Sequence, residues 1–269
     1  MPKSPETQQA RTDTVNYVIG RLTNEAGRAF PHINEVDFTG ELLDRILHPK
    51  KINQGGLGLC GPAAVLYALA KDDIRAYAQL AVDLFTTGTA TVRGWRVEAG
   101  FLTNEQPPLG APIECCDWMM MACIRKNVGF GALTAISNLA HGAYPFEVKI
   151  SLENLGYRNV KNETCTGIFG GAGMKNFHEA VMLLQSDFRV ILCVNGNMFK
   201  DPSAAAGYPN HFCTLKSVQE LTQTVKIRVW QWGKDNKEPT TAGASVYVNL
   251  PQADFLKHYF GYVAGGDLQ

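Results

Sequence analysis

Apolar residues recur at helical spacing through the first half of the chain. Residues 33–48 follow this spacing, and Asp37 or Thr39 is expected to cap the helix at its start. The run from Cys60 to Lys71 is apolar on nearly every side, which predicts a buried helix. Further helices are expected at 72–85, 114–127 and 175–186.

The second half of the chain changes to the period of a β-strand. Short segments rich in β-branched and aromatic residues are separated by loops of Gly, Pro, Asn and Asp. The spacing of the later segments predicts an antiparallel meander whose last strand runs into a helix at 252–262. Strands are expected at 146–150, 189–195, 211–218, 225–233 and 244–250. Because helices come first and strands second, the pattern predicts an α+β fold.

Composition divides the chain into three parts. Residues 1–14 are polar and without hydrophobic period, which predicts a flexible tail. Residues 15–50 predict a helical N-terminal extension, and residues 51–269 a single domain. A chain of 269 residues that is 45% hydrophobic and 19% charged can bury a sizeable core without disulfides or metals.

Charge and cysteine content exclude several classes of function. Twenty-five Lys and Arg residues balance 25 Asp and Glu residues, which argues against a broad basic face for nucleic acid or anionic lipid. No stretch approaches the roughly 20 consecutive apolar residues of a membrane helix, and the polar N-terminus lacks the apolar core of a signal peptide. We therefore expect no membrane insertion and no export through the general secretory pathway. The seven cysteines are odd in number and scattered, as are the histidines, so we expect no disulfide framework, no metal site and no cofactor.

The glycine-rich segment from Gln54 to Pro62 carries the strongest chemical signal. Cys60 stands at the expected start of a helix, where unsatisfied backbone N–H groups and the positive end of the helix dipole favour a thiolate. Pro62 is favoured in a first helical turn. The glycines let backbone approach a bound carbonyl, so the Gln54 side chain and the Cys60 backbone N–H could together hold an oxyanion. The segment predicts a cysteine nucleophile with an oxyanion hole.

A cysteine nucleophile needs a histidine base that is distant in sequence and near in space. His211 opens an apolar strand after a turn, which would hold its ring rigidly at a cleft, and we take it as the base. The other histidines lie in the extension, in a loop or on polar edges of helical stretches: His32, His48, His141, His178 and His258.

These motifs together resemble the papain-like cysteine peptidase superfamily. The shared features are Gln54, Cys60 with a following glycine at a helix start, His211 at a strand start, and a later strand that ends in Trp-x-Trp-Gly. The Cys-Gly-Pro-Ala-Ala form is most similar to the bacteriocin-processing, double-glycine peptidase branch and to papain-like toxin effectors of bacteria. The resemblance implies a papain-like fold in which 51–269 is the catalytic domain, and the N-terminal fifty residues lie outside it.

The third catalytic residue departs from the family pattern. Papain-like enzymes usually carry Asn-Ser-Trp-Gly where this chain has Trp230-Gln231-Trp232-Gly233, so neither Asn nor Asp stands at the expected position. Gln231 is the nearest side chain with an acceptor oxygen, and Asp235 lies just beyond. Strand alternation places Gln231 and the tryptophans on opposite faces. We take Gln231 as the residue that orients the histidine, with Asp235 or a backbone carbonyl as alternatives.

The resemblance implies hydrolysis of a peptide bond in a protein substrate through a thioester. Two alternatives stay open: deamidation or acyl transfer on a target protein by the same Cys–His site, and a catalytically decayed binding module on the same fold. The toxin branch implies a chain that is cytoplasmic in the producing bacterium and delivered into a target cell by a specialised secretion system. It also implies a cognate immunity or inhibitor protein as a partner.

Overall fold

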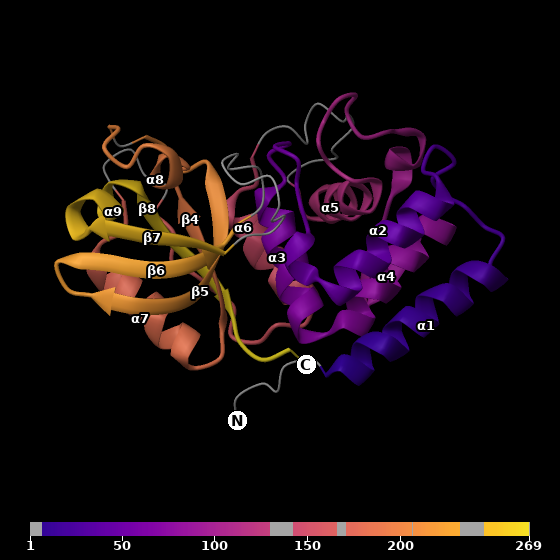
Figure 1. Ribbon diagram of the computed structural model, residues 1–269, viewed down its shortest axis with the longest axis horizontal. Coiled ribbons are helices and arrows are strands. Elements are labelled where there is room, and N and C mark those ends of the chain that lie inside the picture. The colour runs from indigo at the N-terminus through magenta and orange to yellow at the C-terminus, as the bar shows by residue number, and fades with distance from the viewer. Residues whose placement is uncertain (1–6, 130–141, 166–170, 206, 232–244, 269) are drawn as a thin grey trace.

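The computed structural model describes residues 7–129, 142–165, 171–205, 207–231 and 245–268. Within these ranges the chain is α+β, as the sequence predicts. Figure 1 shows the N-terminal helices gathered on one side of the molecule and the C-terminal sheet on the other, with α3 between them. This helix begins at the candidate nucleophile, so its position relative to the sheet determines the site.

The helices follow the predicted segments closely. The expected helices at 33–48, 60–71, 72–85, 114–127 and 175–186 correspond to α2, α3, α4, α5 and α7. The helical elements are α1 (Gln8–Asn24), α2 (Glu35–Leu47), η1 (Pro49–Lys51), α3 (Cys60–Asp72), α4 (Ile74–Thr87), η2 (Gly100–Asn104), α5 (Cys115–Val128), α6 (Pro145–Asn154), α7 (Met174–Gln185), α8 (Asn197–Lys200) and α9 (Gln252–His258).

The strands form a two-stranded and a six-stranded antiparallel sheet. In the larger sheet the order is β3-β8-β4-β5-β6-β7, so β4 to β7 make the predicted meander. The strands are β1 (Thr89–Val92), β2 (Trp95–Glu98), β3 (Lys161–Asn162), β4 (Arg189–Val194), β5 (His211–Leu221), β6 (Thr224–Trp230), β7 (Ser245–Pro251) and β8 (Tyr259–Gly265).

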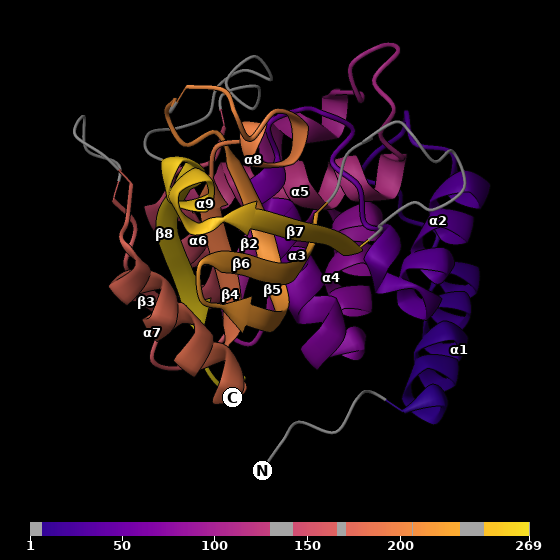
Figure 2. The same cartoon turned by 60° about the vertical axis from the view of Figure 1, so that its left-hand side comes forward.

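The two faces of the large sheet belong to different hydrophobic cores. On β4, Ile191 and Cys193 point into the core of the helical half, whereas Val190 and Leu192 point into a second core with α7 and α9. This alternation follows from the period of two in a strand. Figures 1 and 2 show α3 on one face of the sheet and α7 on the other. The helix that begins with Cys60 therefore packs directly on β5.

Three expectations about the elements are wrong. Residues 146–150 lie in helix α6, because Pro145 suits a first helical turn and Glu147 Oε2 accepts the Tyr144 N–H at 2.7 Å. The helix expected at 252–262 ends at His258, and the following residues form the buried strand β8. Helix α2 is capped by Asn34, which lies upstream of both candidate caps.

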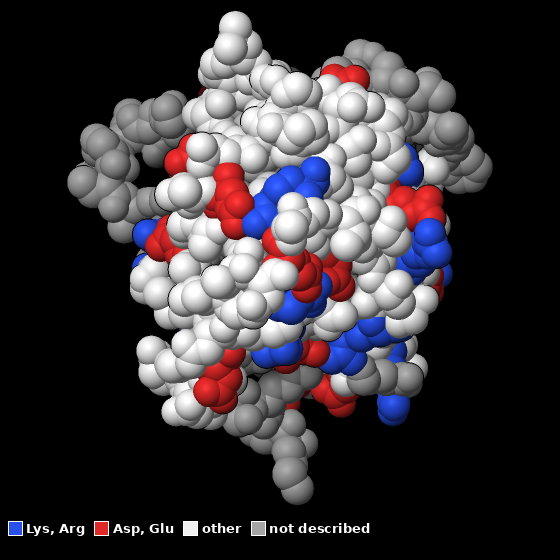
Figure 3. All heavy atoms as spheres, turned by 90° about the vertical axis from the view of Figure 1, so that its right-hand side faces the viewer, with Lys and Arg blue, Asp and Glu red and all other residues white. Residues whose placement is uncertain are grey.

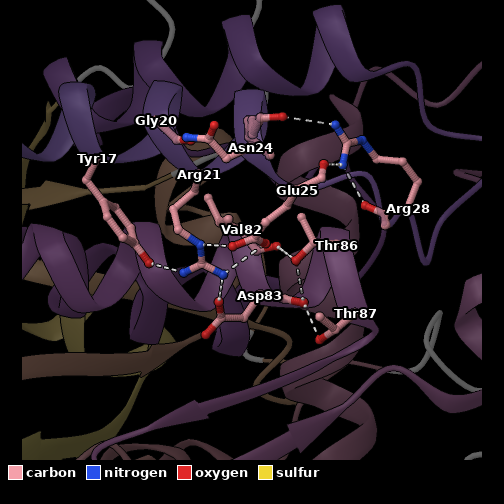
Figure 4. A network of polar contacts seen from close by, with 12 residues as sticks. Tyr17, Gly20, Arg21, Asn24, Glu25, Arg28, Val82, Asp83, Thr86 and Thr87 are labelled. Carbon is pink, nitrogen blue, oxygen red and sulfur yellow. Dashed lines mark hydrogen bonds and ion pairs between the residues drawn. The ribbon is translucent and has the colours of Figure 1, made fainter.

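The helical extension packs into the same core as the rest of the helical half. Helix α1 begins at Gln8, so residues 8–14, expected in the tail, form its first turns. Figure 4 shows Arg21 of α1 reaching Glu25 and, across to α4, Asp83, whose Oδ1 lies 2.9 Å from Nη2. Val18 of α1 and Phe38 of α2 are fully buried in the core that includes Cys60.

Charge on the α1 side of the molecule is mixed. Figure 3 shows acidic and basic side chains interspersed on that side, without a broad face of one sign. Among the helices that the structure describes, none is both long and apolar enough to cross a membrane.

Candidate active site

The candidate nucleophile lies in a tightly packed first helical turn. Cys60 is the first residue of α3 and is only 2% exposed. The following Gly61 has no room for a side chain: a Cβ there would lie 2.6 Å from the Ala143 Cβ and 2.9 Å from Val148 Cγ2. Glycine at this position therefore allows the start of α3 to approach α6 closely.

The surroundings of Cys60 act on its thiol in two directions. Burial raises the pKa of the Cys60 thiol above its ordinary value. The backbone N–H groups of Phe212, Gly61 and Cys60 itself oppose this rise, and the positive charge of Arg125 opposes it further. We expected the helix start to ionise the sulfur. In the folded chain burial outweighs the helix start, so the thiol is the favoured form.

The contact with Phe212 joins the cysteine to the predicted histidine. His211 is the first residue of β5, and Phe212 follows it, so the strand that presents the imidazole also directs a backbone N–H at the Cys60 sulfur. His211 pairs with Val194 on β4, and the edge of its ring faces Phe199 with centroids 5.9 Å apart. The structure thus brings the start of α3 and the start of β5 together.

Gln231 contacts the His211 ring. It directly follows β6 and is 8% exposed, and its Oε1 lies 3.2 Å from His211 Nε2. Since an amide oxygen only accepts hydrogen bonds, Nε2 carries the proton of the neutral ring, and the lone pair is then on Nδ1. A base needs this tautomer if Nδ1 is to accept a proton from a thiol. The alternative third residue, Asp235, lies outside the described residues.

The candidate oxyanion donor is buried in a loop held from two sides. Gln54 is 7% exposed, and among the described residues no group forms a hydrogen bond with its Oε1. The preceding Asn53 donates its backbone N–H to Asp117 Oδ2 at 2.9 Å. The following Gly55 has φ +59°, and a Cβ there would lie 2.6 Å from Ile113 Cβ. A side-chain amide with an unmet hydrogen-bonding atom is therefore held in the loop before Cys60.

A buried ion pair supports this loop. Arg45 of α2 donates to Asp117 of α5, with Nη2 2.8 Å from Oδ2, and the two side chains are 4% and 1% exposed. Burial raises the pKa of the Asp117 carboxyl to about 6, against the opposing effect of Arg45. Our reading of the sequence missed this pair. The sequence feature that indicates such a pair is the acidic residue Asp117 within an apolar helix, since a buried carboxylate needs a partner.

Trp230 ties the end of β6 to the segment before Gln54. Its indole Nε1 donates to the Lys50 carbonyl at 3.0 Å, and its ring stacks on Tyr67 of α3 with centroids 3.8 Å apart. Trp230 is 1% exposed. The side chain before Gln231 is thus fixed against both α3 and the loop that leads to Gln54.

The remaining histidines lie apart from this cluster or outside the described residues. His258 is fully buried at the end of α9, with Nε2 3.0 Å from the Pro202 carbonyl. His32, His48 and His178 are exposed, and His141 is not among the described residues. Within the described ranges, no group of three or more His, Cys, Asp or Glu side chains is arranged to hold a metal ion.

Comparison of the chain with protein-family models, with curated proteins and with solved structures finds no match. The function therefore has to be argued from the residues around Cys60.

Proposed function

We propose that the chain is a papain-like cysteine peptidase that hydrolyses a peptide bond in a protein substrate through a thioester. The observation that carries this proposal is the junction of α3 and β5. There the Phe212 N–H meets the Cys60 sulfur while the neighbouring His211 is held through Nε2 by Gln231. A thiol, an imidazole and an acceptor for the far side of the imidazole are the groups that a thiol hydrolase needs.

In the proposed reaction the Cys60 thiol gives its proton to His211 Nδ1, and the sulfur attacks the scissile carbonyl carbon. The Cys60 N–H and the Gln54 amide N–H donate to the oxyanion of the tetrahedral intermediate. The C–N bond then breaks, and the imidazolium returns the proton to the leaving amine. Water attacks the thioester with His211 as base, which releases the acid and restores the thiol.

A neutral third residue fits this chemistry. Gln231 accepts from Nε2 without adding a negative charge, so it orients the ring more than it stabilises the imidazolium. The burial that raises the Cys60 pKa favours the neutral Cys–His pair at rest. The ion pair would then form when substrate binds. Because Cys60 is 2% exposed, attack also requires the groups over the sulfur to move aside for a substrate.

The test is alkylation and turnover at Cys60. A peptide probe that reacts with thiols at neutral pH is expected to label Cys60 in the wild type, as located by peptide mass mapping, and hydrolysis of a peptide library should fall at least about a thousandfold in Cys60→Ala. Cys165→Ala is the control, because Cys165 is an exposed cysteine outside the cluster. Gln54→Ala should lower turnover by about a hundredfold. Turnover that survives in Cys60→Ala, or a wild type labelled only at other cysteines, would contradict the proposal.

One observation favours a second candidate, a non-enzymatic binding module on the same fold. The Cys60 thiol is almost completely covered, and burial makes it less acidic than a free cysteine. If Cys60 resists alkylation in the native protein at neutral pH but reacts after unfolding, the binding module is the better account.

Deamidation or acyl transfer would use the same residues and differs only in the acceptor. Intact-mass measurement of a target trapped by Cys60→Ala and then exposed to wild-type protein separates these reactions. A peptidase leaves two fragments, whereas the other two reactions change the mass of an uncut chain. The proposed inhibitor partner and delivery into a target cell rest on the family resemblance.

A further inference from the structure

Three cationic side chains lie side by side across neighbouring strands of the large sheet. Ile191 of β4 pairs with Thr214 of β5, so continuing this antiparallel register by two residues places Arg189 beside Lys216. On the other side of β5, Ser217 pairs with Arg228 of β6, with a register shift between Leu215 and Ser217. Lys216 therefore lies between two arginines.

All three belong to the sheet face that packs on α3. Side chains two positions apart in a strand point to the same face. Arg189 therefore shares the face of Ile191, and Arg228 shares the face of Trp230, and both of these reference residues belong to the core that contains α3. Lys216 reaches the helix itself, because its Nζ donates to the Tyr67 hydroxyl at 2.9 Å. Tyr67 belongs to α3, and Lys71 follows one turn later on the same side of that helix. We call Lys71, Arg189, Lys216 and Arg228 the cation row.

In the part of the chain that the structure describes, one carboxylate pairs with the cation row. Asp72 accepts from Arg189 Nε at 2.8 Å and from the Tyr157 hydroxyl at 2.9 Å. Among the described residues no carboxylate forms an ion pair with Lys71, Lys216 or Arg228. Four cations against one carboxylate leave three positive charges. The carbonyls at the end of α3 offset about half a charge.

Elsewhere in the same sheet, a cation is paired with an acid on the neighbouring strand. Lys226 lies on β6 two residues before Arg228, and it pairs with Glu220 of β5, with Nζ 2.5 Å from Oε2. Like charges on neighbouring strands destabilise a sheet, whereas opposite charges stabilise it. Within the described ranges no acidic side chain pairs with Arg228 or Lys216, which leaves a charge that an external anion could balance.

Burial and the neighbouring positive charges lower the pKa values of both lysines. Burial and then Arg189 and Arg228 lower the pKa of Lys216 to about 8, and Asp72 acts in the opposite direction. Burial likewise lowers the pKa of Lys71, with Lys216, Arg11 and Arg189 adding to the effect. An anion bound between these groups would relieve the repulsion that disfavours their charged forms.

We propose that the cation row binds a phosphoryl group. Arg228 is exposed and its planar guanidinium can donate two parallel hydrogen bonds, while Lys216 supplies a point charge. The Tyr67 hydroxyl, which accepts from Lys216, keeps its own proton to donate. Tyr247 on β7 pairs with Arg228 and is 62% exposed, so solvent reaches this end of the row.

The site is independent of the proposed peptidase chemistry. Cys60 and Lys71 stand at opposite ends of α3, and eleven residues of helix separate them by about 16 Å. Loss of the anion therefore leaves the Cys60 sulfur unchanged, and loss of the thiol leaves the cation row unchanged.

The experiment measures thermal unfolding in sodium phosphate against sodium chloride of equal ionic strength. Phosphate at ten times its dissociation constant should raise the midpoint by about 3 °C. Arg228→Gln and Lys216→Met should each abolish most of this shift. Lys226→Gln is the control, because Lys226 lies on the same strand and face but is already paired. Its shift should equal that of the wild type.

A second arm asks whether the phosphoryl group is free or carried by a larger molecule. Phosphoserine replaces inorganic phosphate at the same concentration. A larger shift with phosphoserine identifies a phosphate monoester as the ligand, and a larger shift with inorganic phosphate identifies the free ion. The proposal is overturned if neither shifts the midpoint beyond chloride, or if Arg228→Gln and Lys216→Met respond like the wild type.

Discussion

The two ends of α3 differ in whether the charged side chains near them have partners of opposite charge. At the N-terminal end, backbone N–H groups face the Cys60 sulfur, and the charge that acts on it, Arg125, lies in a buried pair with Glu147. At the C-terminal end, Lys71 and Lys216 have no acidic partner among the described residues. One end has its charges in pairs, and the other holds an excess of positive charge among the described residues.

Burial acts in the same way at both ends. It raises the pKa of Cys60 and lowers that of Lys216, because in both cases it disfavours the charged form. The difference lies in the compensation. Backbone N–H groups oppose the effect at Cys60, whereas Arg189 and Arg228 add to it at Lys216. Changes that remove the compensation at either end test this contrast.

Asp117→Asn is expected to have the largest effect. It leaves Arg45 without the buried member of its carboxylate partners and weakens the anchor of the loop before Gln54. Loss of one partner of a buried pair should lower the free energy of unfolding by about 3 kcal/mol at pH 7, measured in urea. Asp254→Asn, which removes a surface pair with Lys257, should cost less than about 0.5 kcal/mol. Equal losses in the two variants would contradict a supporting role for Asp117.

The pH dependence of Asp117 gives a second readout for the same variant. Because its pKa is raised from 3.8 to about 6, the folded state holds the proton more tightly than the unfolded chain does. The part of its contribution that depends on pH is therefore complete at low pH and is lost as pH rises through 6, and it adds to the hydrogen bonds that Asp117 accepts at pH 7. Asn does not titrate, so the stability difference between wild type and variant should widen as pH falls from 7 to 4. A difference that stays constant would show that Asp117 remains ionised.

Asp72→Asn tests the C-terminal end of α3. The Asp72 side chain is 2% exposed, whereas Arg189 is 26% exposed, so water can partly solvate the arginine left behind. We expect a loss of about 2 kcal/mol in the free energy of unfolding. Phosphate should recover part of this loss, because the variant adds one uncompensated charge to the cation row. Glu220→Gln, which removes the partner of Lys226, should lose less than about 0.5 kcal/mol and change the response to phosphate less than Asp72→Asn does, because Lys226 lies outside the cation row.

Much of the fold follows from local patterns that the sequence displays. The spacing of hydrophobic residues within one continuous segment predicts each of three features. They are the helix that begins at Cys60, the strand that begins at His211 and the meander from β4 to β7. These features could be predicted because each depends on neighbours in the chain. The contact between Gln231 and His211, which are 20 positions apart, was expected instead from the resemblance to the papain-like motif.

Features that depend on distant segments could not be predicted. Arg45 and Asp117 are 72 positions apart, and no local pattern pairs them. The apolar residues of β8 read equally well as a helix, and their place between β3 and β4 is set by the completed sheet. The cation row depends on a register shift beside Lys216, which moves side chains relative to the next strand. The thiol pKa depends on burial that only the packed core creates.

Gly61→Ala should produce a smaller loss than Asp117→Asn or Asp72→Asn, and it acts at the first turn of α3. The new Cβ would lie 2.6 Å from the Ala143 Cβ and 2.9 Å from Val148 Cγ2, so the start of the helix and α6 must move apart. Overpacking costs about 1–3 kcal/mol, while alanine gains about 1 kcal/mol over glycine in a helix, which leaves a net loss of about 1 kcal/mol.

Gly20→Ala separates packing from helix propensity. Gly20 lies within α1, and a Cβ there would have no neighbour within 4 Å, so this variant should gain about 0.5–1 kcal/mol. The Phe212 ring also approaches the Gly61 position, at 3.8 Å. A displaced first turn would therefore shift the sulfur relative to β5. Gly61→Ala should slow labelling of Cys60 while Gly20→Ala leaves it unchanged, and a similar gain in stability for both variants would show that the first turn is not tightly packed.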